Sequence, residues 1–163
     1  MWVSGYERAL GHGRAKVCPV MDEPAATRIA TGKVWLVSWL PAILWAALIF
    51  FMSAVPGDGL PEMPVPQTDK LIHAAVFLVL SALCFRALAR TTRLPPWAAM
   101  ATAALLATLY GAGDEVHQMF TPGRNSDVAD ALADAVGAVA GALLAGALLM
   151  GAVKRHRARR RDG

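Results

Sequence analysis

The amino-acid sequence predicts an all-α integral membrane protein, built as a bundle of four membrane-spanning helices. The 163 residues are 56% hydrophobic and have a mean hydropathy of +0.43, which is too apolar for an ordinary soluble domain. Breaks that contain Pro, Gly and polar residues separate four long apolar stretches. The basic residues gather at alternate breaks, as membrane topology requires.

The four spans follow from these apolar stretches and their breaks. Residues 34–52 have about the length of a bilayer span. They start too late for a signal peptide, and no clean small-residue cleavage site accompanies them. A proline-containing loop leads to a second span at residues 69–89, and a Pro-Pro pair separates it from the third at 97–119. Thr121-Pro122-Gly123 breaks the chain again, and the fourth span covers residues 127–153.

Three regions result from this division. Residues 1–33 mix Gly, Pro and charges of both signs, which predicts a poorly ordered cytoplasmic tail. Residues 34–153 form the four-helix domain, and residues 154–163 form a basic cytoplasmic tail that can also contact anionic lipid. We expect no disulfide and no metal motif from Cys18 and Cys84, the two cysteines.

The orientation follows from the basic residues. Five Lys or Arg residues precede the first span, three lie at the end of the second span and in the break after it, and six follow the fourth. Lys70 and Arg124 are the two that fall on the opposite side. By the positive-inside rule, the chain is a multi-pass protein of the cell membrane with both termini in the cytoplasm. The pI near 9.5 is therefore explained by topology, and no nucleic-acid partner is expected.

Polar residues collect at the outer ends of three spans, where hydrocarbon would not tolerate them unless they face a protein interior, a cavity or water. Four-helix bundles build sites from facing side chains in this way. The candidate site residues are Asp69, Lys70 and His73 of the second span, Glu115 and Gln118 of the third, and Arg124, Asp130 and Asp134 of the following turn and fourth span.

Several motifs in order resemble the VanZ-like family of small four-span bacterial membrane proteins. They are Ser53-Ala54-Val55-Pro56-Gly57, Asp69-Lys70-x-x-His73, Glu115-x-x-Gln118, Pro122-Gly123-Arg124, Asp130 and Gly137-x-x-x-Gly141. The resemblance covers about residues 34–153 and implies a VanZ-like bundle, with a role at the cell envelope and in low-level resistance to the glycopeptide teicoplanin. The chain departs from the family at Asp134, where the family usually has Asn.

Each group of candidates has a structural and a functional interpretation. Arg124 and Asp130 can form an ion pair that holds the turn onto the bundle, or Arg124 with Lys70 can bind an anionic phosphate head group. Asp69 and His73, four residues apart, can pair at a helix end or act with Glu115 in general acid–base catalysis. Asp69, His73, Glu115 and Asp130 are acceptable metal ligands. No strong metal-ligand motif is present, however, so we expect neither a metal nor another cofactor.

Three functions remain open at this stage. The first is a binding or resistance protein that engages a lipid-linked or cell-wall-precursor anion, with Arg124, Lys70, Gln118, Asp130 and Asp134 as binding residues. The second is a membrane-embedded enzyme acting on a lipid head group, with His73, Asp69 and Glu115 as catalytic residues. A proton-coupled transporter is less favoured, because four short spans without an internal repeat do not resemble a transporter fold. The Gly137, Gly141 and Ala145 stripe predicts close helix packing.

Overall fold

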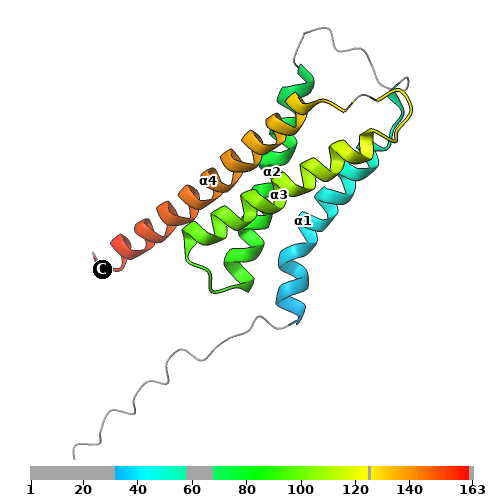
Figure 1. Cartoon of the computed structure of the whole chain (residues 1–163). Helices are drawn as coiled ribbons and strands as arrows, with labels where there is room; N and C mark the ends of the chain where they lie inside the picture. The colour runs from blue at the N-terminus through cyan, green and yellow to red at the C-terminus, as the bar shows by residue number, and fades with distance from the viewer. Residues whose placement is uncertain (1–31, 58–67, 125, 162–163) are drawn as a thin grey trace, which may run out of the picture.

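The computed structural model describes residues 32–57, 68–124 and 126–161. Four helices follow one another along the chain: α1 (Gly32–Ser53), α2 (Thr68–Thr91), α3 (Pro96–Gln118) and α4 (Val128–Arg159). They form an antiparallel bundle (Figure 1), so the predicted all-helical fold is confirmed. The predicted N-terminal tail, except for its last two residues, and most of the proline-containing loop lie outside the described residues.

Helix α2 contacts all three other helices, and its most extensive contact is with α4. Gly137 and Gly141 make this contact possible, because a Cβ atom on either residue would overlap the backbone carbonyl group of Ala74 or Leu78 on α2. Small residues let two helix backbones approach closely in this way. The predicted packing role of the two glycines is confirmed.

Hydrogen bonds from two aromatic side chains attach helix α1 to the bundle. The Trp45 indole donates to the Val76 carbonyl on α2 at 3.0 Å, and the Tyr110 hydroxyl on α3 donates to the Ala46 carbonyl at 2.7 Å. Buried Trp and Tyr side chains usually satisfy their polar atoms like this. Much of the rest of α1 is exposed apolar surface.

The exposed surface of the bundle is apolar around the other helices as well, which suits a lipid environment. Helices α1, α2 and α4 are long and apolar enough to cross a membrane. Helix α3 is long enough, with 23 residues, but it is not among these candidate spans. Four spans and cytoplasmic termini therefore stay predictions.

Helix α4 begins at a side-chain cap and ends beyond the predicted span. Asp127 caps its first turn, and its carboxylate accepts from the Ala129 amide at 2.9 Å. At the other end α4 continues through Arg159, so most of the predicted basic tail is helical and exposed.

Candidate functional site

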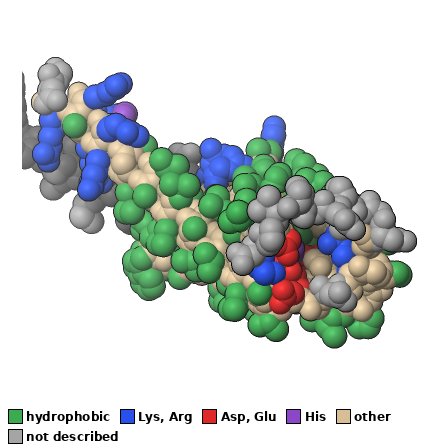
Figure 2. Space-filling model, turned by 90° about the horizontal axis from the view of Figure 1, so that it is seen from above, with side chains coloured by type: hydrophobic (Ala, Val, Ile, Leu, Met, Phe, Trp, Pro, Cys, Tyr) green, Lys and Arg blue, Asp and Glu red, His purple; other side chains and the backbone are tan. Residues whose placement is uncertain are grey.

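The polar side chains gather at one end of the bundle, where α2 begins, α3 ends and α4 begins. Figure 2 shows their acidic members as one group on a largely apolar surface, with basic side chains beside it. We call this group the polar cluster; its members are Asp69, Lys70, His73, Asp114, Glu115, Gln118, Arg124, Asp127, Asp130 and Asp134. It contains more carboxyl groups than cationic ones, which makes it predominantly acidic.

Lys70 is the centre of an ion-pair network at the mouth of the cluster. Its Nζ atom lies 2.9 Å from both Asp127 and Asp130, and 3.4 Å from Asp69. Lys70 was predicted to help bind an anion, but three carboxylates already surround its ammonium group. The Ala129 amide and the Lys70 ammonium hold the pKa of Asp127 below its usual range.

His73 pairs with Asp134 rather than with Asp69. Its Nδ1 atom lies 3.0 Å from Asp134 Oδ1, and since an ionised carboxylate only accepts hydrogen bonds, the imidazole is the donor. The predicted Asp69–His73 pair is therefore wrong, because α4 presents Asp134 to the imidazole. Asp134 is fully buried, and its Oδ2 atom has no hydrogen-bond partner among the described residues.

The local backbone makes room for this carboxylate. A Cβ on Gly111 of α3 would lie 2.8 Å from Asp134 Oδ2 and 3.1 Å from the Phe77 ring. Gly111 thus permits α3 and α4 to enclose the Asp134 side chain between them.

Glu115 lies 5% exposed and joins α3 to the start of α4. Its Oε2 atom accepts from the Ser126 hydroxyl and from the Asp127 amide, both at 3.1 Å. Its Oε1 atom is buried without a partner in the described part of the chain. Two hydrogen bonds therefore orient this carboxylate and leave one oxygen unengaged.

Gln118 donates to Asp114 at 3.0 Å, one helical turn earlier on α3. Sequence analysis had assigned Asp114 no role in the site, although the i, i+4 spacing to Gln118 was a signal that it belonged there. Both side chains are buried.

Arg124 holds the turn after α3 against the end of α1. Its Nε donates to the Val55 carbonyl at 3.2 Å, and one terminal nitrogen donates to the Met52 carbonyl at 3.0 Å. No ion pair joins Arg124 to Asp130 among the described residues, so that predicted pair is wrong. Lys70 forms the ion pair with Asp130 instead, and the guanidinium of Arg124 donates to the Met52 and Val55 carbonyl groups.

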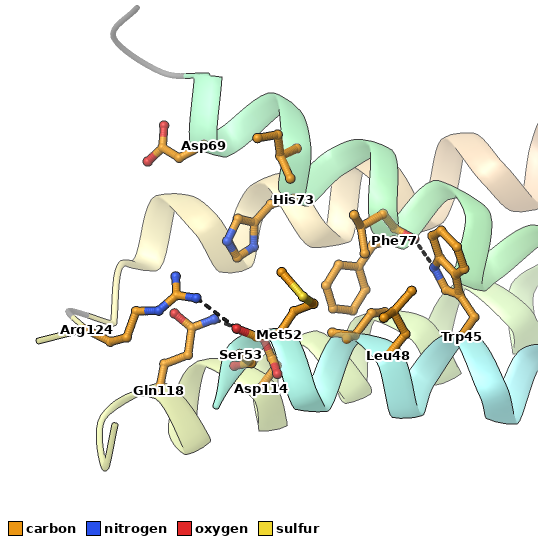
Figure 3. Close-up of a pocket in the computed structure, with 13 residues that line it drawn as sticks. Trp45, Leu48, Met52, Ser53, Asp69, His73, Phe77, Asp114, Gln118 and Arg124 are labelled. Atoms are coloured by element: carbon orange, nitrogen blue, oxygen red, sulfur yellow. Dashed lines mark hydrogen bonds between the residues drawn. The ribbon is translucent and has the colours of Figure 1, made fainter. Parts of the chain in front are cut away.

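A cavity of about 480 Å³ opens beside the cluster, between α1 and α2. Asp69, His73, Gln118 and Arg124 line it, whereas Lys70, Glu115, Asp130 and Asp134 do not. The cavity therefore brings some of the predicted site residues together but not all of them. In Figure 3 the His73 ring points from α2 into the space between α2 and the residues of α3 and Arg124.

The other wall of the cavity is apolar and was not predicted. It is formed largely by α1 and α2: Trp45, Leu48, Ile49, Met52, Ile72, Val76 and Phe77. These side chains resemble any other lipid-facing or core residues in the sequence, and no local signal distinguishes them.

One group within the cluster could hold a metal ion. Each of His73, Glu115 and Asp134 offers a ligand atom, and these atoms all lie within 4.8 Å of one another. This set shares His73 and Glu115 with the ligands considered from sequence, but Asp134 replaces Asp69 and Asp130. No other set of three or more His, Cys, Asp or Glu side chains of this kind occurs in the described ranges.

The apolar helices and the polar cluster at one end define a helical membrane protein with a candidate site at the end of its bundle. Residues 38–150 match the VanZ/LLP1 family. Because the match covers more than half of the chain, this protein belongs to the VanZ/LLP1 family, and the resemblance noted in the sequence is confirmed. A search of curated proteins and a search of solved structures each gave no match.

Proposed function

We propose that this protein binds an amphiphile with an anionic, phosphate-bearing head group in the cavity between α1 and α2. The single observation that carries the proposal is the two-sided lining of that cavity, apolar along α1 and α2 and polar at the cluster end. Its volume of about 480 Å³ falls in the range of about 300–1,000 Å³ that is usual for ligand pockets. A membrane lipid and a lipid-linked cell-wall precursor share this chemistry.

The apolar wall suits an acyl or prenyl chain. Met52 lies near the polar end, and Leu48, Phe77 and Trp45 continue the wall away from it (Figure 3). Leu48 and Ile72 are also 49% and 44% exposed, so this wall is continuous with the lipid-facing surface. A chain could enter sideways from the bilayer without crossing a polar surface.

Arg124 is the residue that would bind the anionic head group. Two of its hydrogen bonds go to carbonyl groups at the end of α1, and a guanidinium has five N–H donors in a fixed planar arrangement. The remaining donors can meet a phosphate or carboxylate oxygen, and their orientation is already fixed by the two carbonyl contacts. Lys70 contributes less than the sequence suggested, since its charge is balanced by the carboxylates around it.

The proposal places the cluster at the outer face of the membrane, with four spans and cytoplasmic termini. The distribution of Lys and Arg supports this orientation. Cysteine labelling in intact cells tests it at Phe120→Cys and Arg157→Cys, in a background without Cys18 and Cys84. Both positions are exposed. Position 120 should react with an impermeant maleimide and position 157 should not; the reverse pattern contradicts the orientation.

Blocking the cavity tests binding. Ile72→Trp adds a bulky ring to the cavity wall, whereas Leu71→Trp places the same ring one position away on α2, on a side chain that is 73% exposed and does not line the cavity. Phosphatidylglycerol and a polyprenyl diphosphate serve as the two probes. The amount retained by the purified protein is measured by native mass spectrometry.

We expect Ile72→Trp to lose retained probe and Leu71→Trp to keep it. The probe that the unaltered protein retains better identifies the source of the head group. Equal retention by both variants, for both probes, contradicts the proposal.

A lipid-linked precursor as ligand would connect the site to glycopeptides, as the family resemblance implies. A host made to depend on this chain should then become more susceptible to teicoplanin when it carries Ile72→Trp, at constant protein abundance in the membrane. If Ile72→Trp leaves susceptibility to teicoplanin unchanged, lipid binding in the cavity does not cause resistance.

The His73–Asp134 pair favours a second candidate, an enzyme acting on the lipid head group. A buried carboxylate that fixes an imidazole beside a cavity is the arrangement that general-base catalysis uses. His73→Gln should then abolish turnover of the retained lipid while retention persists. If the unaltered protein leaves both probes chemically unchanged, this candidate fails and the binding function stands.

A further inference from the structure

The arrangement of unpartnered acidic oxygens inside the polar cluster points to a cation. The cluster holds the carboxyl groups of Asp69, Asp114, Glu115, Asp127, Asp130 and Asp134, against the permanent cations Lys70 and Arg124. Three of those carboxylates surround Lys70. Glu115 and Asp134 lie deeper and have no Lys or Arg within ion-pair distance in the described ranges.

Both of these deep carboxylates keep an oxygen without a partner. Glu115 is 5% exposed and Asp134 is 0% exposed, yet Glu115 Oε1 and Asp134 Oδ2 make no hydrogen bond within the described residues. Burying an acceptor without a partner typically costs about 1–3 kcal/mol, and more for a charged group. Two such atoms on carboxylates of one cluster are therefore unusual unless something binds them.

We propose that His73, Glu115 and Asp134 form a binding site for a divalent transition-metal ion of the Zn²⁺ or Mn²⁺ class. One imidazole and two carboxylates are a mixed nitrogen and oxygen donor set that such ions accept. The three ligands come from α2, α3 and α4, so the ion ties together the three helices that pack most closely.

The distances between the ligand atoms fit a metal site once the three side chains move slightly closer together. The three ligand atoms lie within 4.8 Å of one another. Metal–ligand bonds of about 2.0–2.2 Å place ligand atoms about 3–4 Å apart. A shift of about 1 Å by side-chain rotation is enough to close the set around an ion.

Neighbouring groups already orient Glu115, and His73 and Asp134 already lie in contact. The Ser126 hydroxyl and the Asp127 amide bind Glu115 Oε2 and leave Oε1 for the ion. His73 Nδ1 and Asp134 Oδ1 lie 3.0 Å apart, which is close to the separation of two ligand atoms on one ion, so the ion would replace the hydrogen bond between them. Metal-ligating carboxylates and imidazoles usually have such supporting hydrogen bonds.

His73 connects the ion to the cavity, because it alone of the three ligands lines that space. Three protein ligands leave a coordination position for an exogenous oxygen. A phosphate oxygen of the head group would take that position, a step that rests on the proposed function. An imidazole that ligates a metal is not available as a general base, so this site and His73 base catalysis exclude each other.

The experiment uses the full chain in detergent micelles, stripped with EDTA and without added lipid, and titrates it with Zn²⁺ and with Mn²⁺ alone by isothermal calorimetry. We expect about one ion per chain and a higher midpoint of thermal unfolding when it is bound. His73→Gln, Glu115→Gln and Asp134→Asn should each weaken binding at least about 10-fold. His117→Gln is the matched control, since His117 lies on the same end of α3 but stacks on Phe50 at 4.6 Å; it should leave the affinity unchanged.

The Asp134→Asn variant distinguishes loss of the ion from failure to fold. Asn is the residue that the VanZ-like resemblance leads one to expect at this position, so this variant should fold while it loses the ion. No binding of either ion, or binding that all three ligand variants retain, overturns the proposal and leaves the two carboxylates as protonated, buried acids. Because no lipid is present, that failure is independent of the lipid-retention experiment.

Discussion

Replacing Gly137 by Ala tests the contact on which the whole site depends. A Cβ at this position would lie 2.7 Å from the Ala74 carbonyl carbon, and the carbonyl oxygen is closer still. Ordinary van der Waals contact begins at 3.4 Å, so α2 and α4 must move apart by at least 0.7 Å, the difference between these two distances. The contact is with backbone, which cannot turn aside as a side chain can.

The size of the effect follows from two opposing terms. Overpacking a close contact costs about 1–3 kcal/mol, while replacing Gly by Ala inside a helix gains about 1 kcal/mol. Gly151→Ala is the matched control, since Gly151 also lies on α4 and has nothing within 4 Å of a Cβ. Both variants gain the same helix propensity, so the difference between them is the packing cost alone, about 1–3 kcal/mol in favour of Gly151→Ala.

The assay is reversible unfolding in mixed micelles with increasing sodium dodecyl sulfate, followed by tryptophan fluorescence. Trp45, which bonds to Val76 of α2, reports on the same region of the bundle. Ala74 follows His73 directly, and Gly137 lies one turn after Asp134, so separation of the helices should also weaken the His73–Asp134 contact and with it Zn²⁺ binding. Equal stability of Gly137→Ala and Gly151→Ala would refute the close α2–α4 contact.

Two further predictions concern the loops around the cluster. Gly57→Ala places a Cβ against the Gly123 carbonyl and should lower the free energy of unfolding by about 1–3 kcal/mol, measured in the same micelle titration. The second prediction is a pH dependence. The Ala129 amide and the Lys70 ammonium lower the pKa of Asp127 in the folded protein. The ionised carboxylate therefore stabilises the fold above the pKa of Asp127 in the unfolded chain, and this stabilisation is lost as the pH falls through the lower pKa of the folded protein. Asp127→Asn keeps a good cap and should therefore flatten the decline in unfolding midpoint below about pH 4; an unchanged decline would show that Asp127 does not cause it.

The helices and the location of the polar residues could be predicted from the sequence. Apolar stretches of bilayer length, separated by proline and glycine breaks, predict the helices because both signals are local. The steps of three and four residues from Asp127 through Asp130, Asp134, Gly137 and Gly141 to Ala145 also predict one helix face. The four residues from Asp130 to Gly141 are buried in the structure, whereas Asp127 is exposed as the cap and Ala145 is half-buried. Local periodicity therefore determined which residues face inward.

Only the tertiary structure decided which partners these residues have. Asp134 faces His73, and Lys70 rather than Arg124 binds Asp130, because Gly137 and Gly141 bring α4 close against α2. Arg124 instead donates to the carbonyl groups of Met52, at the end of α1, and Val55, just after it. The distance and rotation between helices set such pairings, and neither quantity is encoded in the spacing along any one helix.

The cavity was also decided by how the helices pack against one another. Its apolar wall comes from α1 and α2, and its polar end from α2, α3 and the turn that carries Arg124. Sequence periodicity shows that Leu48 and Val76 are apolar, but lipid, a packed core and an open cavity all require that property equally. The cavity exists because α1 is held to its neighbours by contacts such as the Trp45 and Tyr110 hydrogen bonds, and not by a stripe of small residues like the one that closes α4 onto α2.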